Sequence, residues 1–208
     1  AFYGCTGLTA VQVPENVTSV GDRAFGNCSS LENISLPEGL ENVGYQFIMN
    51  TGITSLTVPS TVTASGYAYV GSGYAGATAG AMELQEVKFA EGMKKIPENF
   101  CRNGSPNSAI QRIVLPSTVM EVGNSSFQNC AGLETVNFGK EVGKVGDHAF
   151  AGCVSLSRIS FEENSKQVVG TDGKKRLYPL EIDSDAFAGC SSLTEIDWSK
   201  NVKTVGTE

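Results

Sequence analysis

One phrase of 22–23 residues recurs along the chain, and it constrains the fold more than any other feature. Its clearest copy opens at Phe25, continues through the L-x-x-I-x-L step of residues 31–36 and ends in a Val-Gly pair. An aromatic residue opens each of eight copies, and these residues are Phe2, Phe25, Phe47, Tyr69, Phe100, Phe127, Phe150 and Phe187. Self-similarity at such a period is typical of a solenoid, because each turn can bury its apolar face only against its neighbours.

The L-x-x-I-x-L step predicts one short strand in each turn, such as residues 33–36. Its last two apolar residues are two positions apart, so they point to the same face of an extended segment. The Val-x-x-Val-Gly step predicts a second extended segment, and we expect its glycine to allow a turn conformation that other residues avoid. The Ala-Phe-x-x-Cys step then returns the chain as turns or a short 3-10 or helical piece. We expect the phenylalanines to stack as the spine of the solenoid.

The composite pattern LENISLPEGLENVGYQF, preceded by AFGNC, closely resembles the BspA-like, Treponema-type class of leucine-rich repeats. The resemblance covers all eight copies. It implies a mostly β leucine-rich-repeat solenoid, right-handed, of about eight turns, with short parallel strands on its concave side. We therefore expect a single domain over residues 1–208. Because the sequence starts and stops in phase with the repeat, we also expect a fragment of a longer solenoid.

Three insertions lengthen the period, near residues 66–82, 101–109 and 162–178. The first is rich in glycine and alanine and carries Tyr67, Tyr69 and Tyr74. It is either a compact loop over the solenoid or a display of tyrosines for a partner, since tyrosine suits interfaces. The second insertion is short, polar and turn-like. In the third, two apolar pairs flank a Thr-Asp-Gly turn, which predicts a projecting β-hairpin.

Charge and hydropathy exclude two classes of partner. The net charge is −7 and the sequence pI is about 4.8, whereas nucleic-acid affinity needs clustered lysine and arginine. The longest basic run, at residues 174–176, follows a predicted turn and is either a solvated loop or a small binding patch. No segment approaches the roughly 20 apolar residues of a membrane span, so we expect no membrane insertion.

The cysteines are candidates for metal binding or disulfides, but their spacing favours neither. Five occupy one position of the repeat, namely Cys5, Cys28, Cys130, Cys153 and Cys190, and Asn50 stands there in the third copy. Equivalent side chains in stacked turns stay about 4.8 Å apart, beyond the roughly 3.5–4.5 Å between the Cβ atoms of a disulfide. With no CxxC pair, we interpret them as reduced core residues and Cys101 as a thiol outside the ladder. We expect no metal site and no cofactor.

His148 is the only histidine, so any catalytic triad would have to include it. It occupies a position where other copies carry Arg23, Gln46, Ala68, Asn99, Ser125 or Asp185. A position that accepts all of these is a surface position. The acidic pair Asp183 and Asp185 lacks the spacing of a calcium loop and fits a turn. We therefore expect that the chain is not an enzyme.

The side chains that alternate with the buried ladder form an outward strand face. This face is polar and lacks aromatic residues, and its charged members are Glu86, Lys88, Arg112 and Arg158, with acidic residues beyond them. It is either a solvated surface or a contact of modest affinity for a protein or glycan, because tight interfaces usually have aromatic anchors.

Function enters only through the resemblance, since a fold alone is weak warrant for an activity. Some BspA-like proteins bind host extracellular-matrix proteins. The resemblance therefore implies a non-enzymatic protein-binding or adhesion module of a secreted or cell-surface bacterial protein. Its partner would be a host matrix protein, another surface protein or a glycan. The alternative is a structural spacer or stalk that presents another domain and has no partner of its own.

Overall fold

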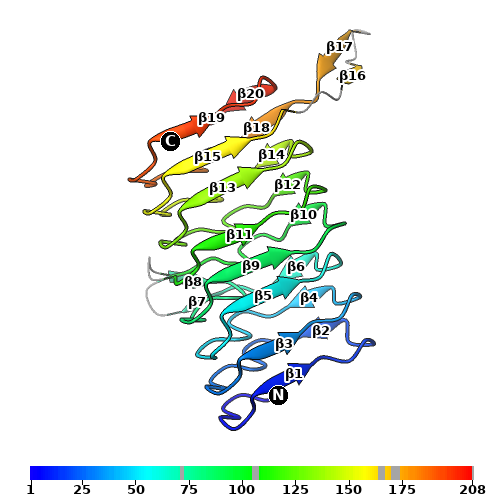
Figure 1. The fold of residues 1–208 in the computed structure, drawn as a ribbon, viewed down its shortest axis with the longest axis vertical. Helices are drawn as coiled ribbons and strands as arrows, with labels where there is room; N and C mark the ends of the chain where they lie inside the picture. The colour runs from blue at the N-terminus through cyan, green and yellow to red at the C-terminus, as the bar shows by residue number, and fades with distance from the viewer. Residues whose placement is uncertain (71–72, 105–107, 164–166, 170–173, 208) are drawn as a thin grey trace.

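The computed structural model is an all-β solenoid of stacked turns, with the two chain ends at opposite ends of the stack (Figure 1). It describes residues 1–70, 73–104, 108–163, 167–169 and 174–207. Within these ranges there is no helix, and so none that could cross a membrane. The returns between strands are turns, which is the first of the two forms expected from the sequence.

The L-x-x-I-x-L steps form the strands that make up the strand face. These strands are β1 (Ala10–Gln12), β3 (Asn33–Ser35), β5 (Ser55–Val58), β9 (Glu86–Phe89), β11 (Arg112–Val114), β13 (Thr135–Phe138), β15 (Arg158–Phe161) and β19 (Glu195–Asp197). Their pairing is parallel, and Leu56, Val87 and Ile113 are register partners, as the repeat predicts. In β5 the side chains alternate between exposed and buried, which places the aliphatic ladder in the core.

These strands form three separate blocks rather than one continuous sheet. The blocks are β1–β3, β5–β9–β11 and β13–β15–β19. No backbone hydrogen bond joins β3 to β5 or β11 to β13, although all four strands lie in the described ranges.

A second row of short strands follows from the Val-x-x-Val-Gly steps. It consists of β2 (Ser19–Val20), β4 (Asn42–Val43), β6 (Ala64–Ser65), β10 (Lys95–Ile96), β12 (Glu121–Val122), β14 (Lys144–Val145), β18 (Leu180–Ile182) and β20 (Val202–Val205). All pairings are parallel, and the row is interrupted once, between β6 and β10, where the first insertion leaves the solenoid.

The glycine that ends this step is required by close packing, not by a special backbone conformation. A Cβ atom at Gly44 would lie 2.3 Å from the backbone nitrogen of Asp22 in the preceding turn. Gly206 faces the backbone nitrogen of Ser184 in the same way, at 2.4 Å. Neither glycine has a positive φ, so our expectation of an unusual turn conformation was wrong at this position.

Positive φ occurs instead in the return segments, at the variable repeat position that His148 occupies in its copy. Six residues at this position are left-handed, with φ between 50° and 59°, namely Arg23, Gln46, Asn99, Ser125, His148 and Asp185. The exception is Ala68, which lies in a hairpin strand. The left-handed region costs a residue with a Cβ atom roughly 1–2 kcal/mol. The position is therefore variable in side chain but constrained in backbone.

The aromatic spine is real but interrupted. Phe2 stacks on Phe25 with ring centroids 5.4 Å apart, and Phe127, Phe150 and Phe187 stack at 5.0 and 5.3 Å. A second row of stacked rings, Phe138, Phe161 and Trp198, lies beside the last three turns. The prediction of a continuous stack was wrong for the turns between these groups.

In the third and fifth turns the phenylalanine lies one residue before the spine position. The spine residue Phe127 lies two positions after left-handed Ser125. Two positions after the left-handed residues Gln46 and Asn99 stand Ile48 and Cys101, which are therefore the spine residues of the third and fifth turns. Both residues are fully buried, as are Phe47 and Phe100 beside them. The spine position therefore holds an aliphatic residue in the third turn and a cysteine in the fifth, and the stack of rings is broken at both.

The same shift moves the cysteine position of the third turn from Asn50 to Thr51. Thr51 is buried, and its hydroxyl donates to the carbonyl of Ile48 at 2.8 Å. Asn50 is left-handed, like Asn27, and its side chain donates to that of Asn27 at 2.8 Å.

In the fourth turn the aromatic residue is absent from the spine. The buried residues Ala77 and Ala79 fill that region, and Phe47 donates its N–H to the carbonyl of Ala77. Tyr69, which the repeat places in the spine, lies in the hairpin strand β7 (Ala68–Val70).

We predict that Phe127→Ala lowers the free energy of unfolding by about 3–5 kcal/mol, because a fully buried ring leaves a cavity. Phe2→Ala is the matched control, since Phe2 is 52% exposed and should cost about 1 kcal/mol or less. Chemical denaturation measures both. Equal losses would contradict the assignment of Phe127 to the core.

We also predict that Ser125→Gly stabilises the chain by about 0.5–1 kcal/mol, because glycine relieves the left-handed strain at φ 54°. Ser29 is an exposed turn residue without positive φ, and Ser29→Gly should be destabilising by about 0.5 kcal/mol through the entropy of the unfolded chain. Thermal and chemical unfolding compare the two variants. A loss of stability in both would refute the strain argument.

Candidate binding surfaces

The predicted strand-face residues form two separate charge groups. Glu86 is the centre of the first group, with its carboxylate 2.7 Å from Lys88 Nζ and 3.5 Å from Arg112 Nε. The hydrogen bond from Lys88 lowers the pKa of Glu86. Arg158 belongs to the second group, 2.6 Å from Asp197 and 3.7 Å from Glu195.

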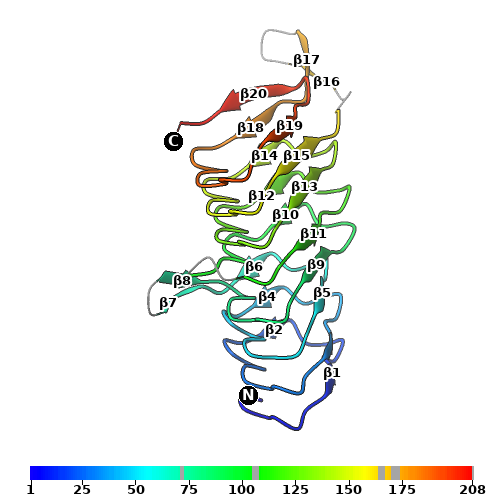
Figure 2. The same ribbon diagram turned by 60° about the vertical axis from the view of Figure 1, so that its left-hand side comes forward.

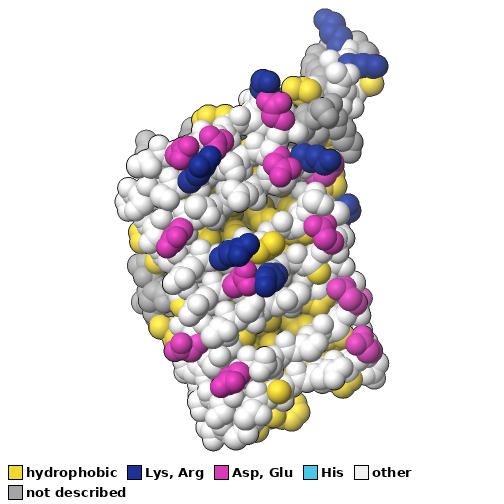
Figure 3. Space-filling model, in the orientation of Figure 1, with side chains coloured by type: hydrophobic (Ala, Val, Ile, Leu, Met, Phe, Trp, Pro, Cys, Tyr) yellow, Lys and Arg dark blue, Asp and Glu magenta, His cyan; other side chains and the backbone are white. Residues whose placement is uncertain are grey.

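Each group is therefore neutralised largely within the chain. Figure 3 shows positive and negative side chains of this face in mixed groups, with no broad patch of one sign. Such exposed ion pairs each contribute about 0–1 kcal/mol. Arg112 is the most available member, because its side chain is 72% exposed.

Arg112 also borders the break between β11 and β13. A polar hollow of about 380 Å³ lies over this break, and its lining includes Gln111, Arg112, Glu134, Thr135 and Asn137. The hollow gives the strand face a concave feature that the alternation of residues did not predict.

The first insertion forms an antiparallel hairpin of β7 (Ala68–Val70) and β8 (Gly73–Ala75). In Figure 2 this hairpin projects from one side of the solenoid, while β5, β9 and β11 run along the other. The insertion combines features of both forms we considered, because the hairpin projects while the residues Ala77, Ala79 and Ala81 that follow it are buried in the solenoid. A partner for the tyrosines stays a prediction.

Two of the three predicted tyrosines form an exposed aromatic pair. Tyr67 is 56% exposed and Tyr74 is 43% exposed, and their ring centroids lie 5.9 Å apart. The side chain of Tyr69 lies outside the described part of the structure.

A residue of the second insertion, Arg102, contacts this pair, and we did not predict that contact from the sequence. The guanidinium carbon of Arg102 lies 4.8 Å from the Tyr74 ring centroid, within cation–π range. Its Nη1 atom donates to Asn99 Oδ1 at 3.0 Å, and burial lowers the pKa of Arg102. The backbones also meet, because a Cβ atom at Gly73 would lie 2.7 Å from the carbonyl oxygen of Gly104. We call Tyr67, Tyr74 and Arg102 the hairpin cluster.

The third insertion also contains a hairpin, as predicted. Its strands are β16 (Gln167–Val169) and β17 (Lys175–Leu177), and they pair antiparallel. The expected Thr-Asp-Gly turn between them lies outside the described residues, while Lys174 and Lys175 of the basic run are exposed.

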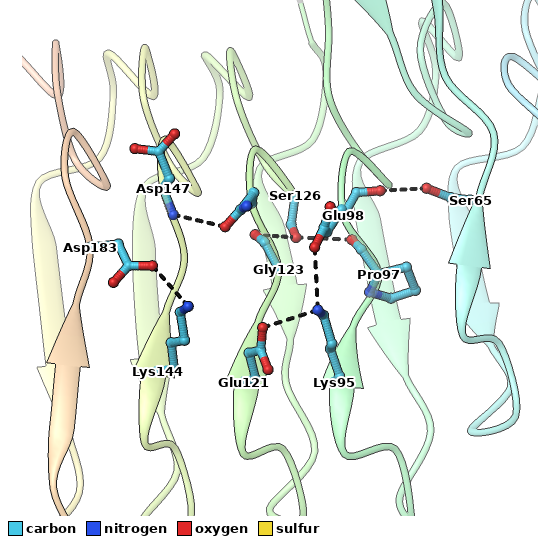
Figure 4. A network of polar contacts seen from close by, with 11 residues as sticks. Ser65, Lys95, Pro97, Glu98, Glu121, Gly123, Ser126, Lys144, Asp147 and Asp183 are labelled. Atoms are coloured by element: carbon cyan, nitrogen blue, oxygen red, sulfur yellow. Dashed lines mark hydrogen bonds and ion pairs between the residues drawn. The ribbon is translucent and has the colours of Figure 1, made fainter.

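The second row of strands carries a ladder of alternating charge (Figure 4). Lys95 lies 3.0 Å from Glu121 on the next strand and 3.3 Å from Glu98, and Lys144 lies 3.1 Å from Asp183. At the break between β6 and β10, the Ser65 hydroxyl donates to the Glu98 carbonyl at 2.7 Å. The contacts of Glu121, Asp183 and Ser65 join neighbouring turns, whereas the Lys95–Glu98 pair lies within one turn. The ion pairs neutralise much of the charge of this surface within the chain.

All six cysteines are free thiols, and the repeat position makes a regular hydrogen bond. Cys28, Cys130, Cys153 and Cys190 each direct Sγ at the carbonyl of the spine residue one turn earlier, at 3.0–3.4 Å. Burial raises the pKa of Cys190 to about 11 and that of Cys130 well above its usual value.

Cys101 lies outside the cysteine ladder, as expected, and it is a buried thiol at the spine position. Its carbonyl accepts the thiol of Cys130, as the Phe127 carbonyl accepts that of Cys153. Burial raises the pKa of Cys101 to about 12. A thiol in this state is a poor nucleophile, because the thiolate is the reactive form.

One juxtaposition of ionisable groups escaped the sequence analysis. His148 Nδ1 lies 2.9 Å from Asp147 Oδ2, and His148 Nε2 lies 3.8 Å from Asp185 Oδ2 on the next turn. The third insertion separates His148 from Asp185 along the chain, and only the stacking of turns brings them together.

Comparison with known proteins identifies the repeat. A family model described as "BspA type Leucine rich repeat region (6 copies)" matches residues 1–106, 105–171 and 179–208. No curated protein matches the chain.

Three of the similar solved structures are bacterial proteins, and two of them are described as leucine-rich. A cell surface protein of Faecalibacterium prausnitzii A2-165 is 21% identical, with a TM-score of 0.44 over 96% of this chain and 62% of that one. The leucine-rich repeat protein of T. pallidum is 20% identical, with a TM-score of 0.38 over 99% and 64%. The pneumococcal vaccine antigen PcpA is 15% identical, with a TM-score of 0.41 over 91% and 56%. The chain spans less than two thirds of each of these structures.

We predict that Cys5 alone reacts rapidly with a thiol reagent in the folded chain at pH 8. Cys5 is exposed, whereas Cys28, Cys101, Cys130 and Cys153 are buried and Cys190 is half-buried, and burial raises the pKa of these five thiols and keeps them protonated. Mass spectrometry of labelled peptides, with and without denaturant, measures this. Rapid labelling of Cys130 in the folded chain would contradict the buried ladder.

Proposed function

Because this chain belongs to the BspA-type leucine-rich-repeat family, we propose that it is a non-enzymatic protein-binding or adhesion module of a secreted or cell-surface bacterial protein. The partner we propose is a protein, either a host matrix protein or another surface protein. The hairpin cluster is the surface we propose for the contact.

The exposed tyrosines of the hairpin cluster carry this proposal. Tyrosine and arginine are enriched among the residues that dominate binding energy at interfaces. Tyr67 and Tyr74 present large rings to solvent on a hairpin that projects from a rigid scaffold (Figure 2). Because Arg102 already holds the Tyr74 ring, little side-chain entropy would be lost when a partner binds.

The strand face is the weaker candidate for the main contact. Lys88, Arg112 and Arg158 each have an acidic neighbour within the chain. A partner would have to replace these pairs, and their exposure makes the exchange nearly neutral in energy. We assign this face a supporting role, through the hollow beside Arg112.

The same internal pairing favours the alternative function, a structural spacer. A spacer needs a stable stack and a surface without unsatisfied charge, and the alternating ladder of Lys95, Glu121, Lys144 and Asp183 provides both. In this alternative the tyrosines of the hairpin bind no other molecule. The two functions therefore differ in whether the chain binds another molecule saturably through these tyrosines.

We predict that the purified chain binds saturably to an array of matrix proteins and glycans at physiological salt. The double variant Tyr67→Ala/Tyr74→Ala should weaken that binding by about 30-fold or more, as expected for hot-spot residues worth about 2 kcal/mol. Arg112→Ala is the control on the strand face and should change the affinity by less than about threefold.

Three other outcomes of this experiment would each support a different function or binding surface. Loss of binding in Arg112→Ala, with the tyrosine variant unaffected, would move the contact to the strand face. Saturable binding only to glycans would replace the protein partner. A silent array with a folded monomer would favour the spacer.

A further inference from the structure

The single histidine of the chain lies between two carboxylates. Asp147, His148 and Asp185 each offer one ligand atom, and these atoms all lie within 4.8 Å of one another. The three side chains are partly exposed, at 48%, 40% and 27%. Solvent and small ions can therefore reach them.

Turn stacking fixes this arrangement. His148 and Asp185 occupy the same left-handed position of neighbouring turns, with φ of 54° and 53°. The backbone N–H of His148 donates to the carbonyl of Ser184, and that of Asp185 donates to the carbonyl of Thr207. Both side chains therefore start from held backbone positions on adjacent turns.

The hydrogen bond to Asp147 orients the imidazole. Asp147 Oδ2 lies 2.9 Å from Nδ1, which favours the tautomer with its proton on Nδ1 and a lone pair on Nε2. Nε2 then faces Asp185 Oδ2 across 3.8 Å, which is too long for a hydrogen bond. Metal-binding histidines commonly have this pattern, with a carboxylate on the other ring nitrogen.

The gap between Nε2 and Asp185 is close to the width that a metal ion needs. Ligands about 2.1 Å from a tetrahedral zinc ion lie about 3.4 Å from each other. The observed separation of 3.8 Å would have to close by a few tenths of an ångström, which small side-chain rotations allow.

The charge around the histidine also favours a cation. No lysine or arginine pairs with Asp147 or Asp185 in the described part of the chain. The nearby carboxylate of Asp183, in contrast, lies 3.1 Å from Lys144. Two carboxylates without a basic partner make the site electronegative.

We propose that His148 and Asp185 bind a divalent transition-metal ion of the Zn²⁺ type. His148 Nε2 and an Asp185 carboxylate oxygen are the direct ligands, water completes the coordination, and Asp147 positions the imidazole. An imidazole ligand selects Zn²⁺ and its neighbours over Ca²⁺ and Mg²⁺, which prefer oxygen ligands. The ion would join two turns that the third insertion separates in the sequence.

The test is calorimetric titration of the folded chain with Zn²⁺ in a Cys5→Ser background, which removes the exposed thiol as a competing ligand. We expect saturable binding of one ion per chain. His148→Gln and Asp185→Asn should each weaken it by at least tenfold, and Asp147→Asn by about tenfold, as for outer-shell carboxylates. Asp183→Asn is the matched control, an acidic residue of the same turn that pairs with Lys144, and its affinity should be unchanged.

A second readout separates ligation from a change in folding. The imidazole NMR signals of His148 should shift on addition of Zn²⁺ and should not shift with Ca²⁺. The proposal is overturned if no saturable binding occurs at millimolar Zn²⁺, or if His148→Gln and Asp185→Asn bind as tightly as the parent. Circular dichroism confirms that each variant is folded.

Discussion

The whole structure depends on backbone hydrogen bonds between one turn and the next. In the return segments, Phe25 donates its N–H to the carbonyl of Phe47, and Asn27 donates to that of Met49, at 2.8–2.9 Å. A single turn cannot satisfy these groups internally, and buried backbone groups without partners are costly. Glycines such as Gly44 allow the turns to approach closely enough for these bonds. The left-handed positions, the cysteine-to-carbonyl bonds and the stacked rings all follow from this spacing.

The repeat predicted the strands because their signal is local. Apolar residues two positions apart define an extended segment with one buried face, and the register of Leu56, Val87 and Ile113 follows from the alignment. The details of the core were less predictable, because packing depends on total volume. Phe100 and Cys101 occupy the positions that Ser126 and Phe127 occupy in the next turn, and all four are fully buried. An alignment on aromatic residues therefore misplaced the spine by one residue in the fifth turn.

The candidate sites were the least predictable part, because their members are distant in the sequence. Tyr67 and Tyr74 could be identified from residue type, but Arg102 reaches them from a different insertion. The alignment of the repeat placed His148 and Asp185 at the same position of successive copies, but the variety of side chains at that position suggested only a surface residue, so their contact with each other was not predicted. In a solenoid, the residues of one site come from different turns, and insertions increase their separation in the sequence. Their contacts are therefore difficult to predict from the sequence alone.

The breaks in the two rows of strands have a mechanical consequence, because they do not coincide. The strand face is interrupted between β3 and β5 and between β11 and β13, where β4–β6 and β12–β14 remain paired. The second row is interrupted between β6 and β10, where β5–β9 is continuous. At every break in one row of strands, the other row is therefore continuously hydrogen-bonded. A pulling force along the axis meets an intact row of hydrogen bonds at each of these breaks, so the stack resists separation there without a continuous sheet on either side.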